Sequence, residues 1–456
     1  MSGKLDLIVR GGKIVTPDGV SCAELGVAEG RIARIAPSIA ESATMEIDAT
    51  GRYVFPGIID AHVHFNEPGR TEWEGLASGS AALAAGGGTV FFDMPLNSEP
   101  PVLDAARLNE KRALAERKSR VDFALWGGLT PANLDRLGEL RDAGAIGLKA
   151  FMCASGIESF PSADANTLHA GMAVAAKLGL IVAVHAEDDA LAAKLTAEQK
   201  AQGRTDARAY LAARPVEVEL VAIRQALECA GETGCALHVV HVSSPEGIAL
   251  IDEARRRGVD VTAETCPHYL LLNESDVVRL GAPAKCAPPL RDEARRTALW
   301  ENLRAGRIDT IGSDHSPAPA EMKSSKNFFA IWGGIGGVQH GFELLFSESS
   351  AEGRLAHDLP VLAAVLARNV ARRFRLGAGK GAIAEGSDAD FSLVEFGAER
   401  EIGAEELLTR HPVSAYLGRR SRVRVTQTFV RGGAAWADGR LTNPPPRGQF
   451  LRPQPA

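Results

Sequence analysis

The sequence lacks the features by which several large classes of protein are identified. No run of about 18 apolar residues occurs in the 456 residues, so we expect no transmembrane helix. Basic residues form no block and the formal net charge is −6, which leaves no electrostatic footprint for nucleic acid. No long amphipathic stretch rich in lysine and arginine is present either, so nothing indicates binding to a membrane surface.

Cysteine is scarce, and its six residues are scattered. They form no CxxC pair, a pattern typical of reduced thiols in the cytoplasm rather than of a disulfide framework. The first residues, MSGKLDLIVRGGKIV, contain no apolar segment of signal-peptide length behind a basic one. We therefore expect a cytoplasmic protein. Its composition, 45% hydrophobic and 24% charged, is that of an ordinary globular protein.

Nucleotide-binding loops are also missing. The run GGGT, formed by Gly86, Gly87, Gly88 and Thr89, is followed by neither a helix N-terminus nor GK[ST]. The run therefore predicts a turn rather than a phosphate loop. No dinucleotide fingerprint occurs elsewhere, so we expect no organic cofactor.

The two ends of the chain share a strand-and-turn pattern. Residues 1–54 and residues 381–445 both alternate short apolar runs with glycine and other turn residues. Neither segment can bury a core alone, so we expect the two to pair into one small β-sandwich domain. Residues 446–456, rich in proline, predict an irregular, partly ordered tail.

The middle of the chain, residues 55–380, repeats the order strand, loop, helix. The expected strands are near-continuous apolar runs, as in a parallel sheet buried on both faces. Eight such units predict an α/β fold, a TIM-like (β/α)8 barrel, and a doubly wound open sheet is the alternative. The expected strands are residues 57–65, 89–95, 122–128, 146–152, 181–187, 237–244, 261–267 and 309–314.

Polar residues lie toward the carboxyl ends of these strands, where barrel enzymes hold their active sites. His62 and His64 are two residues apart on one strand and therefore face the same side. Taken singly, a strand histidine is more often a hydrogen-bonded core residue than a ligand. Four histidines and one aspartate at one barrel mouth instead indicate a site for zinc, manganese, iron or cobalt. The further members of this set are His185, His241 and Asp314, and Lys149 lies at the end of a neighbouring expected strand.

Lys149 ends the fourth expected strand. A buried ammonium beside divalent cations is strongly disfavoured. Once deprotonated, the amine can add carbon dioxide and become an anionic carbamate, whose two oxygens can bridge two metals. We therefore expect Lys149 to be N6-carboxylysine. The alternative is a strand-end lysine that reaches for solvent.

Three further histidines have less certain places in this pattern. The run HVVH offers His238 and His241, and we choose His241 as the ligand because it lies nearer the strand end. His238 is then expected to pack toward the helices. His268 and His315 fit two roles equally: contacts to the ligands, or core histidines.

The motifs PGIIDAHVHFNEPG, GLKAFM, VHAE, HVVHVSSPEG and GSDHSP resemble those of the cyclic amidohydrolases, a family that includes dihydroorotases, hydantoinases and allantoinases. The resemblance covers nearly the whole chain. HFNEPGRTEWEG, DMPLNSEPP, KAFMCASG and FFAIWGGIGGVQ are most similar to the allantoinase branch. The resemblance to this family implies two divalent metal ions per chain, with zinc as the first expectation and cobalt, manganese or iron as alternatives. It also implies a homo-oligomer, often a tetramer. The implied ligands are His62, His64 and Asp314 for one metal, His185 and His241 for the other, and carboxylated Lys149 as the bridge.

Departures from the family patterns separate its branches. Dihydroorotases carry an arginine two residues after HxH, where this chain has Asn66, and a histidine four residues beyond the aspartate, where it has Ala318. Hydantoinases carry a tyrosine five residues after the lysine, where it has Ala154. The resemblance therefore implies hydrolysis of a small molecule, allantoin, to allantoate in purine degradation. Asp314 is the implied catalytic residue, and the expected substrate contacts are Asn97, Ser155 and Ser316.

Two other functions stay open. A hydantoinase or dihydropyrimidinase acting on a related cyclic ureide would share the whole metal site and differ only in its substrate pocket. A non-catalytic scaffold on the same barrel is a more distant alternative. Such relatives usually lose metal ligands, whereas this chain keeps all six.

Overall fold

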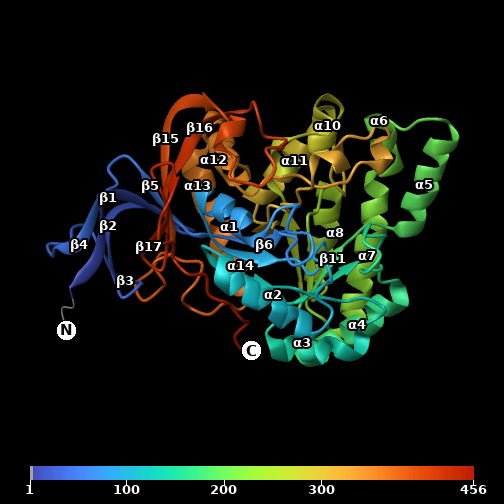
Figure 1. Cartoon of the computed structure of the whole chain (residues 1–456), viewed down its shortest axis with the longest axis horizontal. Coiled ribbons are helices and arrows are strands. Elements are labelled where there is room, and N and C mark those ends of the chain that lie inside the picture. The colour runs from blue at the N-terminus through green and yellow to red at the C-terminus, as the bar shows by residue number, and fades with distance from the viewer. Residues whose placement is uncertain (1–3, 456) are drawn as a thin grey trace.

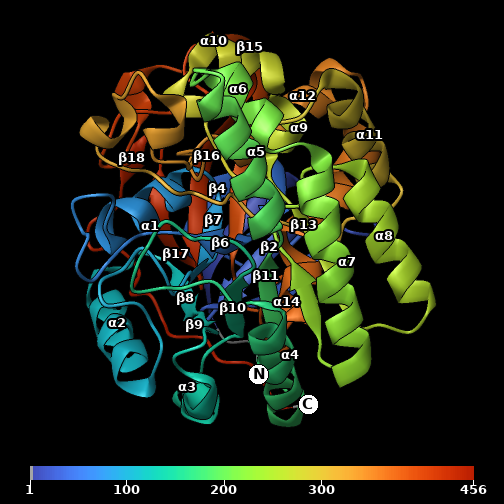
Figure 2. The same cartoon turned by 90° about the vertical axis from the view of Figure 1, so that its right-hand side faces the viewer.

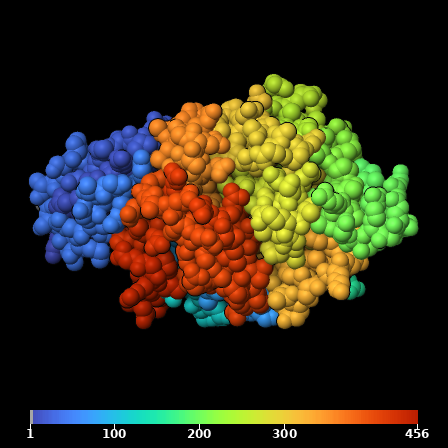
Figure 3. Space-filling model, turned by 90° about the horizontal axis from the view of Figure 1, so that it is seen from above, coloured from blue at the N-terminus to red at the C-terminus, as the bar shows by residue number. Residues whose placement is uncertain are grey.

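Strands from both ends of the chain form one sheet in the computed structural model, which describes residues 4–455. The strands are β1 (Leu5–Thr16), β2 (Gly19–Ala28), β3 (Arg31–Ala36), β4 (Ala43–Asp48), β5 (Tyr53–Pro56), β15 (Phe391–Glu401), β16 (Arg420–Val430), β17 (Gly433–Ala437) and β18 (Arg440–Leu441). Their hydrogen-bonded order is β18-β17-β16-β15-β5-β1-β2-β3, with β4 beside β1. In Figure 1 the blue N-terminal and red C-terminal strands lie side by side, and Figure 3 shows the same neighbourhood from above.

The two ends meet where β5 pairs antiparallel with β15, with Val54 opposite Leu393. One buried apolar cluster contains Leu7 and Ile14 from the N-terminal strands and Phe429 from the C-terminal ones. Each end therefore completes the core of the other. The β-sandwich shape and the boundaries at residues 54, 381 and 445 stay predictions, and residues 1–3 lie outside the described residues.

The middle of the chain supplies parallel strands in sequence order. They are β6 (Ile58–Val63), β7 (Gly88–Asp93), β8 (Asp122–Leu125), β9 (Gly127–Gly128), β10 (Leu148–Phe151), β11 (Val182–His185), β12 (Leu237–Val239), β13 (Val261–Thr265) and β14 (Thr310–Ile311). One sheet holds β6-β7-β8, and a second holds β9 to β14. The expected strand 122–128 is broken in two at Trp126, and a parallel bridge joins Val63 of β6 to His315 beyond β14. The α/β class is confirmed, and complete closure into a (β/α)8 barrel stays a prediction.

Helices surround these strands in both Figure 1 and Figure 2. They are α1 (Leu76–Ala85), α2 (Ala105–Lys118), α3 (Leu137–Ala143), α4 (Ala165–Leu178), α5 (Asp189–Ala201), α6 (Ala207–Ala213), α7 (Val216–Thr233), α8 (Pro245–Arg256), α9 (Pro267–Leu271), α10 (Glu274–Leu280), α11 (Glu293–Arg304), α12 (Gly341–Ala351), α13 (Leu355–Ala363) and α14 (Asn369–Arg373). Their starts follow from the sequence. At α8, the Ser244 hydroxyl accepts the Gly247 N–H at 3.2 Å, and Pro245 occupies the first turn, where no donor is needed.

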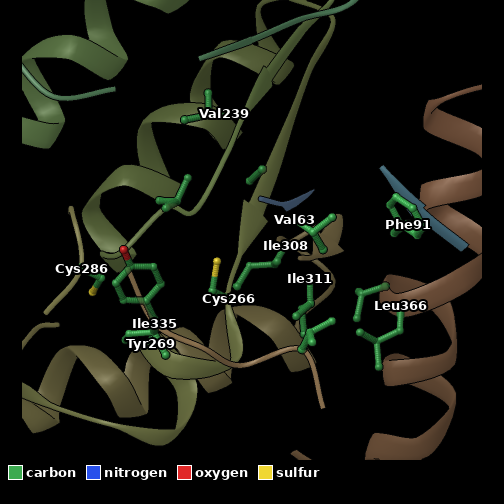
Figure 4. Packing of buried hydrophobic residues seen from close by; sticks show 14 of the residues in the cluster. Val63, Phe91, Val239, Cys266, Tyr269, Cys286, Ile308, Ile311, Ile335 and Leu366 are labelled. Atoms are coloured by element: carbon green, nitrogen blue, oxygen red, sulfur yellow. The ribbon is translucent and has the colours of Figure 1, made fainter. Parts of the chain in front are cut away.

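Apolar side chains fill the space between strands and helices. Three strand residues, Val63 of β6, Phe91 of β7 and Ile311 of β14, belong to the same buried cluster as Leu366, which lies in the helical segment Ala364–Arg368 (Figure 4). The Phe91 ring stacks on the Phe123 ring, with centroids 5.9 Å apart. Burying one such side chain contributes about 1.5–3 kcal/mol to the free energy of unfolding. This core therefore holds in place the strand ends that carry the polar residues.

The C-terminal tail is irregular, as predicted, but it is fastened to β8. The Leu451 N–H donates to the Phe123 carbonyl at 2.7 Å, and the Gln449 N–H donates to Asp122 Oδ1 at 2.8 Å. The tail therefore adds hydrogen bonds at the start of a strand, and its partial order stays a prediction. Residue 456 lies outside the described residues. Within residues 4–455, no helix has the length and apolarity needed to cross a membrane.

Candidate metal centre

The structure brings the predicted ligands together at the carboxyl ends of the parallel strands. His62 lies on β6, Lys149 on β10 and His185 at the end of β11. His241 and Asp314 lie just beyond the short strands β12 and β14. The residues that line one cavity of about 480 Å³ include His62, His64, His185, His241 and Asp314. All six predicted ligands are buried, so apolar strands carry a polar cluster at one place.

His62, His64 and Asp314 form the tightest group. Asp314 Oδ1 lies 3.2 Å from His62 Nε2 and 3.4 Å from His64 Nε2. One ligand atom from each of the three side chains lies within 4.8 Å of the others. Two imidazoles and a carboxylate are a donor set that suits zinc and related divalent ions. The group could therefore hold one such ion.

His185 and His241 face each other through ring nitrogens, with His185 Nδ1 3.0 Å from His241 Nε2. Burial lowers the pKa of both imidazoles, and for His241 the charge of His185 lowers it further. Both rings are therefore neutral near pH 7, the form that binds metal. Two neutral nitrogens at this distance share one proton or bind one cation, so the pair could contribute to a second metal site.

Lys149 carries an amine with no hydrogen-bond partner in residues 4–455. Its side chain is fully buried, and burial lowers its pKa to about 8 despite the opposing charge of Asp314. Buried Lys111 differs, because its Nζ lies 2.8 Å from Asp93 Oδ2 and donates to the Met94 carbonyl. An ammonium at Lys149 would be unsatisfied, whereas a carbamate between two cations would be satisfied. The residues present therefore fit a two-metal centre.

Two buried carboxylates, which the sequence analysis missed, hold the histidines. Glu264 Oε1 lies 2.8 Å from His62 Nδ1, and Glu187 Oε2 lies 2.9 Å from His185 Nε2. Against the effect of burial, His62 lowers the pKa of Glu264 to about 2, so the group is ionised. Each carboxylate accepts from one ring nitrogen and leaves the other free for a metal. The available signal was an acidic residue in an apolar run, in VHAE and in VTAETC.

The remaining histidines have separate places. His238 packs edge-on against Phe374 beyond α14, as predicted, and its Nδ1 lies 2.8 Å from Thr262 Oγ1. His315 binds the backbone of a neighbouring loop, because its Nδ1 accepts the Gly337 N–H at 3.1 Å. His268 is buried, and neither of its ring nitrogens has a partner within residues 4–455.

The expected substrate contacts Asn97, Ser155 and Ser316 all line the cavity. The Asn97 amide lies 3.4 Å from His64 Nδ1. The Ser155 hydroxyl already donates to the Phe160 carbonyl at 2.7 Å and so also fastens its own loop. Contact of these three residues with a substrate stays a prediction.

The backbone is strained at three non-glycine residues that line the cavity and at Asn66, two residues after His64. Asn66, Asn97, His241 and Asp314 have φ of 64°, 67°, 41° and 45°. A non-glycine residue in this region costs about 1–3 kcal/mol, and such residues cluster at functional sites. The strain coincides with the cavity, which supports a functional role for these loops.

Comparisons with known proteins show which proteins the whole chain resembles. A model of the amidohydrolase family matches residues 53–435. The chain is 50% identical over 450 residues to the allantoinase of Deinococcus radiodurans, covering 99% of each chain. It is also 50% identical to the allantoinase of Rubrobacter xylanophilus, covering 98% of each.

Solved structures of hydantoinases have the same overall fold. The L-hydantoinase (dihydropyrimidinase) from Arthrobacter aurescens superposes with a TM-score of 0.95 at 33% identity, covering 98% of this chain and 100% of that one. A D-hydantoinase superposes with a TM-score of 0.90 at 31% identity, covering 99% of each chain. Sequence identity to the hydantoinases is therefore lower than to the two allantoinases.

Proposed function

The chain belongs to the amidohydrolase family, among its allantoinases, and we propose that it hydrolyses the ring amide of allantoin to give allantoate. The observation that carries the proposal is 50% identity over 99% of a curated allantoinase. The buried cluster of histidines and Asp314 supplies the donor groups that a metal-dependent hydrolase of this family needs. A hydantoinase activity is the second candidate, which the structural similarity to hydantoinases supports.

Two divalent ions, zinc by preference, fit the donor groups. His62, His64 and Asp314 would hold one ion, His185 and His241 would hold the other, and carboxylated Lys149 would contribute an anionic group to both. The unpartnered Lys149 amine and the facing nitrogens of His185 and His241 support this assignment. When bound, such a pair of ions polarises a carbonyl group and lowers the pKa of a water molecule to near neutrality.

Asp314 performs the proton transfers in the proposed reaction. Although burial raises its pKa, the neighbouring His62 and His64 hold that pKa well below the ordinary value. Asp314 is therefore a carboxylate near pH 7 and accepts the proton of the attacking water. It then returns that proton to the ring nitrogen as the amide bond breaks. Glu264 and Glu187 hold His62 and His185 in orientation meanwhile.

The finer architecture belongs to the same proposal. We propose that β6 to β14 close into a (β/α)8 barrel, that the terminal strands form a small β-sandwich, and that the protein is a homotetramer. The parallel bridge between Val63 and His315 supports closure, because it links the first and last barrel strands.

The substrate range tests the proposed function. We expect the purified protein to hydrolyse allantoin with a kcat/KM about 10²-fold or more above that for dihydroorotate, because Asn66 replaces the arginine that would pair with the carboxylate. Steady-state kinetics on allantoin, hydantoin, dihydrouracil and dihydroorotate measure this ratio. Equal or faster turnover of dihydroorotate would contradict the proposal, and faster turnover of hydantoin would favour the second candidate.

Glu264→Gln tests how the first metal site is held. We expect about 10–100-fold weaker metal binding, because the variant loses the charge that orients His62 Nδ1. Metal content after equilibration at buffered free zinc measures the change. Glu343→Gln is the matched control, since Glu343 is a buried carboxylate paired with Arg400 away from the cavity. Equal metal affinity in the two variants would rule out the positioning role of Glu264.

A further inference from the structure

The cavity is also lined by cations that the proposed chemistry does not use. Arg214 follows α6, and Lys285 lies in the loop before Ala287. The Arg214 guanidinium carbon lies 5.7 Å and Lys285 Nζ lies 4.8 Å from the centre of the Tyr210 ring. Tyr210 also lines the cavity, so these three side chains form one wall. We call Tyr210, Arg214 and Lys285 the cationic wall.

Arg214 is held on one side and open on the other. Its Nη1 donates to Glu187 Oε2 at 2.6 Å, and the same oxygen lies 2.9 Å from His185 Nε2. No other oxygen acceptor in residues 4–455 bonds to the guanidinium, whose side chain is 21% exposed and borders the cavity. Its remaining N–H groups can therefore donate to a molecule in the cavity.

Lys285 fixes the shape of this wall. Its Nζ donates to the carbonyls of Phe328 and Ile331, which belong to a loop that also lines the cavity. No carboxylate in residues 4–455 pairs with it, and burial, with the charge of Arg214, lowers its pKa to about 7. Tyr210 and Lys285 donate to backbone carbonyls, whereas Arg214 keeps N–H groups free, so the complement of this wall is an oxygen atom of the ligand.

We propose that Arg214 determines substrate specificity by donating to the carbonyl oxygen of the ureido substituent on the ring. The inference rests on the proposed function, in which the ring amide lies at the metal ligands. Arg214 and His185 line the same cavity and both bond to Glu187 Oε2, so a substituent on that ring can reach the guanidinium. Unsubstituted hydantoin has the same ring and lacks the ureido group. Arg214 therefore distinguishes the two molecules by a contact that only one of them makes.

Arg214→Gln tests this assignment through a ratio. We expect kcat/KM for allantoin to fall about 10–100-fold, the usual effect of losing a hydrogen bond to a charged group. For hydantoin we expect a much smaller loss, caused only by the missing ion pair with Glu187, and where its turnover is too slow, its inhibition constant is measured instead. Arg214→Lys keeps the charge but loses the planar guanidinium, so its kcat/KM for allantoin should lie between those of the unaltered protein and Arg214→Gln. Arg208→Gln, on the exposed side of α6, is the matched control and should leave both values unchanged.

Other results would overturn the assignment. Parallel losses for allantoin and hydantoin, with reduced metal content, would mean that Arg214 acts only through Glu187 and His185. Unchanged kinetics for both substrates would mean that it contacts neither. Failure of the unaltered protein to hydrolyse allantoin would be seen before any variant is made, and it would reject the proposed function together with this inference.

Discussion

The Lys149→Ala variant should lose nearly all hydrolysis of allantoin together with most of its bound metal. A free ammonium at this position would repel each metal ion by about 4 kcal/mol per unit charge at 4 Å, even with an effective dielectric constant of about 20. A carbamate would instead supply the anionic bridge between the ions. The fold should survive, because Lys149 Nζ has no hydrogen-bond partner in residues 4–455 whose loss could destabilise it.

Rescue of the Lys149→Ala variant by a small carboxylic acid tests whether the lysine supplies an anionic group. Acetate or propionate should enter the space left by the lysine side chain and restore part of both metal content and activity. Elemental analysis and allantoate formation, with and without propionate, measure the two effects. Lys177→Ala, at an exposed lysine of α4, is the control. Its metal content and activity should equal those of the unaltered protein, with or without propionate. If Lys149→Ala binds two metals and hydrolyses allantoin normally, Lys149 is a structural lysine.

The Asp314→Asn variant should retain its fold and lose kcat by about 10²–10⁴-fold, the usual span for a lost acid/base group. Asparagine has the same shape but cannot accept the proton of the attacking water. Its effect on kcat should therefore exceed any effect on metal content, which elemental analysis of the same sample measures. Asp260→Asn, at a largely exposed carboxylate, is the control. A variant that keeps more than about a tenth of the activity would contradict the role assigned to Asp314.

The strands and most of the candidate site could be predicted because their signal is local. A histidine or lysine within an apolar strand stands out, and strand ends in a parallel fold meet at one edge. His62, Lys149 and His185 were predicted in this way, and the structure places His62 and His185 on the lining of one cavity and buries Lys149. The α/β class likewise follows from the repeated order of strand and helix.

Other features depend on contacts between distant segments and leave no local signal. Glu264 matters because its carboxylate lies 2.8 Å from His62, 202 positions away in the sequence. Arg214 lies between two helices, and its sequence neighbourhood is that of an ordinary surface turn. The third expected strand is broken at Trp126, whose indole N–H donates to the Ala61 carbonyl of β6, 65 positions away, at 3.0 Å. Sequence patterns cannot anticipate such pairings.

The backbone conformations of His241 and Asp314 could not be predicted from the sequence either. Both were expected on strands, yet β12 ends at Val239 and β14 ends at Ile311. Each residue instead lies in a loop with positive φ, 41° for His241 and 45° for Asp314. Local propensity argues against this conformation, and the surrounding structure must impose it. Residue type therefore identified the candidate ligands, whereas the backbone that positions them could only be seen in the structure.

The most direct test of the account is the rate of allantoate formation from allantoin by the purified protein before and after metal removal. We expect allantoate as the product, loss of activity after chelation, and recovery when zinc or another divalent ion is added back. Hydantoin serves as the comparison substrate in the same assay. No allantoate from the metal-loaded protein, or an unchanged rate after its metal has been removed, would contradict the account.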